Sequence, residues 1–107
     1  MPTKFMNTQR IEMLKKLVSE DPSDPFYPYA LALEYLHTGR HEALSLLLDV
    51  INKYPEYLPS YYQAGLLSIE FGQLEEGQAI LEKGIALAQK QNDRKALNEL
   101  RSLLDNI

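Results

Sequence analysis

The sequence predicts an all-α fold, a short solenoid of antiparallel helical hairpins. Three observations support this: apolar residues recur at helical spacing, turn residues separate the helices regularly, and both patterns repeat after 33 or 34 residues. The recurring positions are Leu14, Leu47 and Leu81; Val18, Ile51 and Ile85; Ile11 and Leu44; Ala32 and Gly65; and Gly39 and Gly72. One hairpin of this size cannot bury its apolar face alone, so the hairpins must stack. A stack of this kind exposes an extended surface, which favours binding over catalysis.

The first half of the chain divides into three predicted helices. The first covers about residues 8–20 and carries an apolar stripe made of Ile11, Leu14, Leu17 and Val18. It stops before Pro22, because proline cannot continue a helix, and Asp24 before Pro25 predicts an N-cap. A second helix is expected over about 25–38, closed by Gly39, and a third over about 40–54, ended by Pro55.

The second half repeats this plan and adds one helix. A fourth helix begins near Pro59 and ends at Gly72, and a fifth covers about 73–90. A sixth segment, about 93–104, has one apolar and one polar side, which is what the last helix of a stack needs to seal the core. The apolar side is Ala96, Leu97, Leu100, Leu103 and Leu104, and the polar side is Arg94, Lys95, Asn98, Glu99, Arg101 and Ser102.

Composition excludes several classes of protein. The chain has 107 residues, enough for one domain (1–107), and no cysteine, so disulfides and thiolate metal sites are ruled out. The first ten residues contain no continuous apolar segment, so we expect neither a secretion signal nor a membrane partner, and a cytoplasmic location. A net charge of -4 argues against nucleic acid as a partner. The basic residues Lys4, Arg10, Lys15 and Lys16 are interpreted as a solvated helix face.

These features resemble the tetratricopeptide repeat family, whose unit of about 34 residues has small and aromatic residues at fixed positions. The second full repeat carries Tyr61, Ala64, Gly65, Ser68, Gly77 and Leu81, with Gln89 where proline is usual. The first carries Pro28, Leu31, Ala32, Tyr35, Ala43, Leu47 and Pro55, with a turn that is one residue shorter. The opening helix matches only half a unit, with Arg10 at the usual alanine, followed by Leu14 and Pro22.

The resemblance implies a small stand-alone protein of bacterial type, folded as a right-handed α-solenoid. Its parts are a half repeat (8–22), two repeats (25–55 and 58–90) and a capping helix (93–105). Gly65, Gly77 and Gly84 lie inside predicted helices, where glycine costs roughly 1 kcal/mol relative to alanine. We therefore expect close contacts between helices at these three positions.

The resemblance also implies a binding site, because the first helices of the hairpins line a concave groove in this family. The residues carried over to groove positions are Phe26, Tyr29, Leu33 and Leu36, beside His37, and Pro59, Tyr62, Leu66 and Ile69, beside Glu70. This set is almost entirely apolar, which indicates a groove for a peptide or protein surface. The charged clamp with which some relatives hold acidic chaperone tails has no counterpart at Tyr29, Leu33 or Gln63. In the alternative, the chain's own termini or a second copy fill the groove and the protein is a structural or homo-oligomeric subunit.

Catalytic and metal sites are not predicted. His37 and His41 are four residues apart, but Gly39 lies between them at a predicted helix break, so they do not share a helical face. Glu75 and Glu76 lie in a first helical turn, where carboxylates favour the helix dipole. No phosphate-binding glycine loop or nucleophile motif is present. We expect no enzyme activity, no cofactor and no metal.

Overall fold

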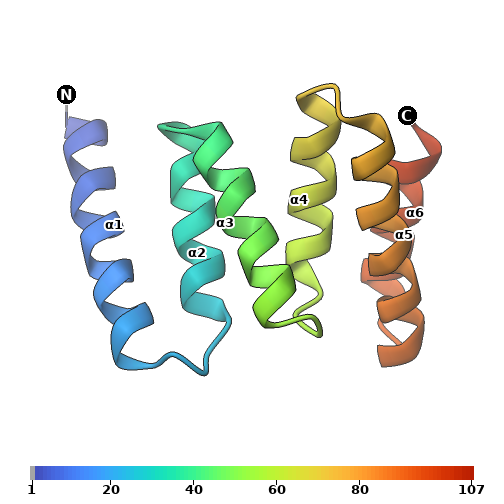
Figure 1. Cartoon of the computed structure of the whole chain (residues 1–107), viewed down its shortest axis with the longest axis horizontal. Helices are drawn as coiled ribbons and strands as arrows, with labels where there is room; N and C mark the ends of the chain where they lie inside the picture. The colour runs from blue at the N-terminus through green and yellow to red at the C-terminus, as the bar shows by residue number, and fades with distance from the viewer. Residues whose placement is uncertain (1) are drawn as a thin grey trace. The chain divides into compact units, whose positions relative to one another are not determined.

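The computed structural model describes the backbone of residues 2–107 and the side chains from residue 7 onward. Over this range the chain is built from helices, which confirms the predicted all-α class (Figure 1). The α-helices are α1 (Pro2–Glu20), α2 (Phe26–Glu34), α3 (Arg40–Lys53), α4 (Pro59–Glu70), α5 (Leu74–Gln91) and α6 (Arg94–Asp105). A 3-10 turn, Tyr35–His37, follows α2. The chain divides into two compact units, residues 1–50 and 51–107, and each is described by itself.

Two predicted helix boundaries in the first unit need correction. Helix α1 begins at Pro2 rather than near residue 8, because proline suits a first helical turn and no breaking residue follows it. The second helix was expected to continue to residue 38, but α2 ends at Glu34 and tightens into the 3-10 turn. The start of α2 agrees with expectation, since Asp24 Oδ1 accepts a hydrogen bond from Phe26 N at 2.9 Å.

The first unit is held by a small apolar cluster between α1 and α2. Ile11 and Leu14 of α1 are buried with Leu31 of α2, and further side chains pack around them. These are Leu17, Tyr27, Ala30, Tyr35 and Leu46. Beside the cluster, Arg10 Nη1 lies 3.5 Å from Glu34 Oε2, and the Glu34 side chain is only 13% exposed. Helix α1 therefore docks on α2 through both apolar contacts and a partly buried ion pair.

The second unit is an α4–α5–α6 bundle with its core between the three helices. Leu58, Leu81, Ala88 and Leu100 form the buried cluster. The predicted close contacts at the helical glycines are confirmed by the space around them. A Cβ at Gly65 would lie 2.5 Å from Leu81 Cδ2. Likewise, a Cβ at Gly77 would lie 2.7 Å from Ile69 Cγ1, and one at Gly84 would lie 2.8 Å from Tyr61 Cβ.

The turns of the second unit are two helix C-caps of the same design. Gly72 has φ = 81°, and its neighbour Gln73 donates from N to Ser68 O at 2.9 Å. Asn92 has φ = 57°, and Asp93 N donates to Ala88 O at 2.9 Å. In each case a left-handed residue lets the following N–H satisfy a free helix carbonyl. Both turns fold the chain back so that α4, α5 and α6 alternate in direction (Figure 1).

The loop before α4 is tied to the same unit by hydrogen bonds. Tyr61 Oη donates to Pro55 O at 2.6 Å, and Gln91 Nε2 donates to Glu56 O at 2.9 Å. Burial raises the pKa of the Tyr61 phenol above its ordinary value of 10.0. The protonated phenol thus serves as a structural donor. Among the described helices, none combines the length and apolar content needed to cross a membrane.

Candidate partner-binding surface

In the first unit the predicted contact residues lie on one side of α2. At 100° per residue, Phe26, Tyr29 and Leu33 occupy an arc of about 60°. Leu31, which is buried against α1, lies about 160° from Leu33 around the helix. Helix α1 therefore covers the opposite side of α2. Phe26 is 53% exposed, and Tyr29 and Leu33 are half-buried.

Leu36 departs from this helical arrangement. It is half-buried and lies in the 3-10 turn, beyond the last residue of α2. A 3-10 turn rotates the chain by about 120° per residue, compared with about 100° in an α-helix. Three residues at this rotation complete about one turn, so Leu36 lies nearly in line with Leu33 and continues the apolar side of α2.

In the second unit Tyr62, Leu66 and Ile69 follow one side of α4, and all three are half-buried. They differ in what buries them. Ile69 packs over Gly77 of α5, so much of its side chain belongs to the core of this unit. Tyr62 also packs against the core cluster, whereas Pro59 is exposed at the start of the helix. Leu66 and the outer part of Tyr62 are the portions best placed for a partner.

A hollow lies between α4 and α6 on the Tyr62 side. Its volume is about 380 Å³, and its lining residues are Tyr62, Asn98, Glu99, Ser102, Leu103 and Asn106. Three of these, Asn98, Glu99 and Ser102, belong to the polar side of the capping helix, which the sequence pattern indicates only as a solvent-facing surface. They are exposed as expected, and they also form one side of this open hollow. Asn98, Ser102 and Asn106 are four residues apart, and this spacing predicts that they lie along one side of the helix.

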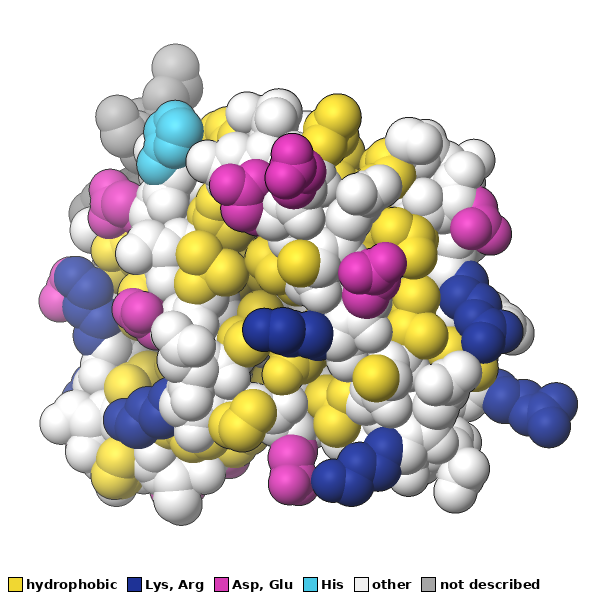
Figure 2. Space-filling model, turned by 45° about the vertical axis from the view of Figure 1, so that its right-hand side comes forward, with side chains coloured by type: hydrophobic (Ala, Val, Ile, Leu, Met, Phe, Trp, Pro, Cys, Tyr) yellow, Lys and Arg dark blue, Asp and Glu magenta, His cyan; other side chains and the backbone are white. Residues whose placement is uncertain are grey.

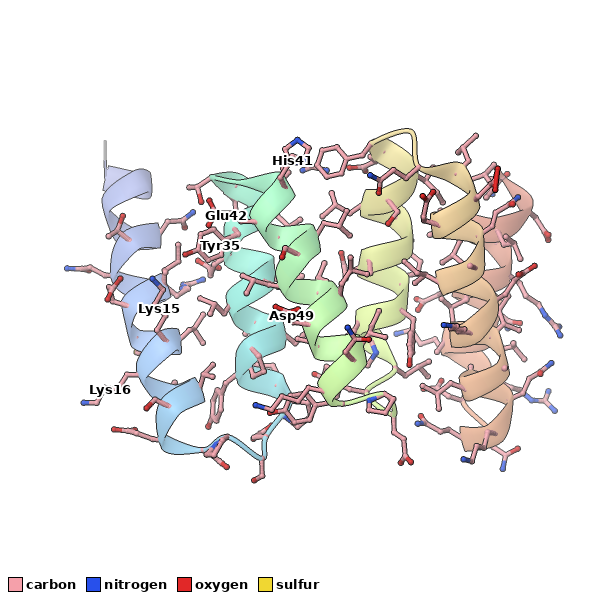
Figure 3. The ribbon with its side chains drawn as sticks, in the orientation of Figure 1. Lys15, Lys16, Tyr35, His41, Glu42 and Asp49 are labelled. Carbon is pink, nitrogen blue, oxygen red and sulfur yellow. The ribbon has the colours of Figure 1, made fainter. Side chains whose placement is uncertain are left out.

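Three tyrosines and the two histidines lie in or near these helices. Tyr27 and Tyr35 pack on the cluster of the first unit, and Tyr61 is buried, so these three rings are structural. His37 and His41 are exposed, and His41 lies in the first turn of α3, the helix that also carries Glu42 and Asp49 (Figure 3). In the described part of the chain, no three histidine, aspartate or glutamate side chains group as metal ligands would.

Among the described basic residues of α1, Arg10, Lys15 and Lys16 form ion pairs. Lys15 Nζ lies 3.7 Å from Glu12 Oε2, and Lys16 Nζ lies 3.9 Å from Glu20 Oε2. Lys15 and Lys16 project from α1 in Figure 3, whereas the Lys4 side chain lies outside the described residues. On the face drawn in Figure 2, apolar side chains reach the surface between acidic and basic ones. This mixture differs from the clustered positive charge that nucleic-acid binding draws on.

Several solved structures share this fold. A crystal structure of a tetratricopeptide repeat domain protein from Salinibacter ruber aligns with a TM-score of 0.74 at 30% identity, covering 78% of this chain and 94% of that one. A solution NMR structure of a tetratricopeptide repeat domain protein from Salinibacter ruber aligns with a TM-score of 0.75 at 32% identity, covering 80% and 88% of the two chains. A protein from Bordetella parapertussis aligns with a TM-score of 0.75 at 22% identity, over 90% and 84%, and supports the fold alone.

The fold and the paired small residues define a helical-repeat protein. The identity and coverage of the Salinibacter ruber structures go further: this chain belongs to the tetratricopeptide repeat family. Domains of this family generally mediate protein–protein interactions. No protein-family model matches the sequence, and neither does any curated protein.

Proposed function

We propose that this protein is a non-enzymatic interaction module that binds a peptide or a protein surface through the apolar sides of α2 and α4. The observation that carries the proposal is the partial exposure of large apolar side chains on those sides. In the first unit they lie opposite the contact with α1, and in the second they lie at the edge of the core cluster. Aromatic and leucine side chains in such positions supply contact area when a partner covers them. The contact residues are Phe26, Tyr29, Leu33, Leu36, Tyr62, Leu66 and Ile69.

The proposal includes the organisation and setting of the chain. We assign a half repeat at residues 8–22, repeats at 25–55 and 58–90, and a capping helix at 93–105, all within one domain. We also assign a cytoplasmic location, which the absence of cysteine fits because a reducing compartment selects against disulfides. The partner is a protein or peptide and requires no cofactor.

A second candidate is a homo-oligomer whose apolar sides are covered by another copy of the chain. The observation that favours it is a set of large apolar side chains exposed elsewhere on the surface, including Met13 at 56% and Leu74 at 52%. Side chains of this size are often buried when subunits associate. In this case the residues assigned to partner binding are assembly contacts.

The two candidates differ in the molar mass of the free protein. We expect the wild type to be a monomer at micromolar concentration by sedimentation equilibrium. We also expect Leu33→Glu and Leu66→Glu to abolish capture of a partner from cell extract, while Leu74→Glu, an exposed apolar residue outside the contact set, retains it. Far-UV circular dichroism checks that the variants remain helical. A dimer that persists below micromolar concentration and dissociates in Leu66→Glu would replace the proposal with the oligomer.

A further inference from the structure

The hollow between α4 and α6 is lined mainly by polar groups, unlike the apolar sides of α2 and α4. Its polar lining consists of two amides, one hydroxyl, one phenol and one carboxylate, and its single charged group among the described residues is Glu99. No lysine, arginine or histidine is among the lining residues. The hollow is therefore rich in hydrogen-bond acceptors and carries one negative charge.

Glu99 is available to a ligand. Among the residues that the structure describes, no cation forms an ion pair with its carboxylate. Lys95 lies one turn earlier on α6, but a lysine N-terminal to a glutamate is the less favourable order for a helical pair. Arg101 is about 200° from Glu99 around the helix and so faces away. The carboxylate thus has no competing partner of opposite charge.

The neighbouring amide is oriented to accept as well. Asn106 Nδ2 donates to Ser102 O at 2.7 Å, which uses one of its two N–H donors, and its Oδ1 remains as an acceptor. Asn98 and Ser102 add further acceptors one helical turn apart. Several acceptors around one carboxylate match the several N–H donors of an ammonium or guanidinium group.

The apolar part of the lining fits the same kind of ligand. Tyr62 and Leu103 form the non-polar surface of the hollow, and both pack on the core cluster behind it. Long basic side chains bury their aliphatic stems on surfaces of this kind while their charged ends stay near water. The face of a tyrosine ring also attracts a cation directly.

From this arrangement we infer that the hollow receives a lysine or arginine side chain of the partner peptide, with Glu99 as the charge that selects it. The inference rests on the proposed function, since it assigns one subsite of the same binding surface. An acidic side chain is disfavoured there by repulsion from Glu99, and an apolar one gains nothing from that charge.

Synthetic peptides test this subsite directly. The probes are acetylated, amidated heptapeptides Ala-Leu-Ala-Xaa-Ala-Leu-Ala in which Xaa is lysine, arginine, norleucine or glutamate. Their dissociation constants are measured from the amide shifts of ¹⁵N-labelled protein. We expect the lysine and arginine peptides to bind about two- to fivefold more tightly than the norleucine peptide, as for a partly exposed charge pair. The glutamate peptide is expected to bind most weakly, and the shifts should centre on Tyr62 and residues 98–106.

Two variants identify the source of the preference. Glu99→Gln should remove the preference for the basic peptides, so that the lysine and norleucine peptides bind with similar dissociation constants. Glu82→Gln, the matched control, removes an exposed carboxylate on α5 outside the hollow and should leave the preference intact. Equal loss in both variants would indicate a general charge effect and overturn the inference.

The outcomes also separate this inference from the function on which it rests. If all four peptides bind equally and Leu66→Glu weakens each of them, the surface binds peptides but the basic subsite is wrong. If no peptide shifts the amides of residues 98–106, the subsite is equally wrong, and the capture experiment with Leu33→Glu and Leu66→Glu still decides the function by itself.

Discussion

Replacing Gly65 by alanine should destabilise the protein, although the same change stabilises most helices. The added Cβ would lie 2.5 Å from Leu81 Cδ2 and 2.8 Å from Leu81 Cγ. Leu81 is fully buried, so its side chain has no open space to move into. Overpacking of this kind costs about 1–3 kcal/mol, and the better helix propensity of alanine returns about 1 kcal/mol. The free energy of unfolding should therefore fall by up to about 2 kcal/mol.

A double-mutant cycle with Leu81→Val tests the stated cause. Unfolding is followed by far-UV circular dichroism in urea for the wild type, both single variants and the double variant. Leu81→Val alone should cost about 0.5–1.5 kcal/mol, as for loss of one buried methyl group. In the double variant the closest contact, that with Cδ2, is removed, so the combined loss should be smaller than the sum of the single losses. If Gly65→Ala instead raises the stability by about 1 kcal/mol, as at an open helical position, the close contact does not exist in solution.

Three further changes test the caps and the tyrosine hydrogen bond, each by urea unfolding. Gly72→Ala places a Cβ on a residue with φ = 81° and should cost about 1–2 kcal/mol. A loss near zero would mean that this turn is not left-handed. Asp93→Ala removes the acceptor of Ala96 N, 3.0 Å away, and should cost about 1 kcal/mol, with Asp93→Asn close to wild type. Tyr61→Phe removes the donor to Pro55 O and should cost about 1 kcal/mol. Because burial raises the folded-state pKa of Tyr61 above 10.0, its contribution is full below that pH and is lost as the pH rises further. The decline in stability above pH 10 should therefore be smaller in Tyr61→Phe; an unchanged decline would contradict this.

The fold could be predicted because its determinants are short-range and repeat. Proline and glycine fix where helices stop, so Pro22, Pro55 and Gly72 marked three boundaries correctly. The left-handed C-cap at Asn92 was harder to see, since asparagine is compatible with many local structures. The 3-10 turn after α2 also gave no signal, because Tyr35 and Leu36 continue the helical apolar pattern.

The site could be predicted only in part, because periodicity identifies the side of a helix but not what covers it. Tyr62 and Ile69 occupy equivalent-looking apolar positions, yet Ile69 fills the space over Gly77 while Tyr62 borders a hollow. The polar residues of α6 were assigned to solvent because polarity alone is what an uncovered helix surface shows. The hollow that they line depends on α6 packing beside Tyr62, a contact that no local pattern encodes.

The position of the hollow beside Tyr62 also restricts the sequence of a matching peptide. Tyr62 and Leu66 are one helical turn apart, an axial rise of about 6 Å. Two residues of an extended peptide span about 7 Å, and residues two apart point to the same side. A basic residue in the hollow therefore places an apolar residue two positions away over Leu66, as in the heptapeptide design. Moving each leucine one position toward the lysine should turn it from this surface and weaken binding severalfold, measured by the same amide titration. If this shifted peptide binds as well as the original, the basic subsite and the leucine contact do not act on one extended segment.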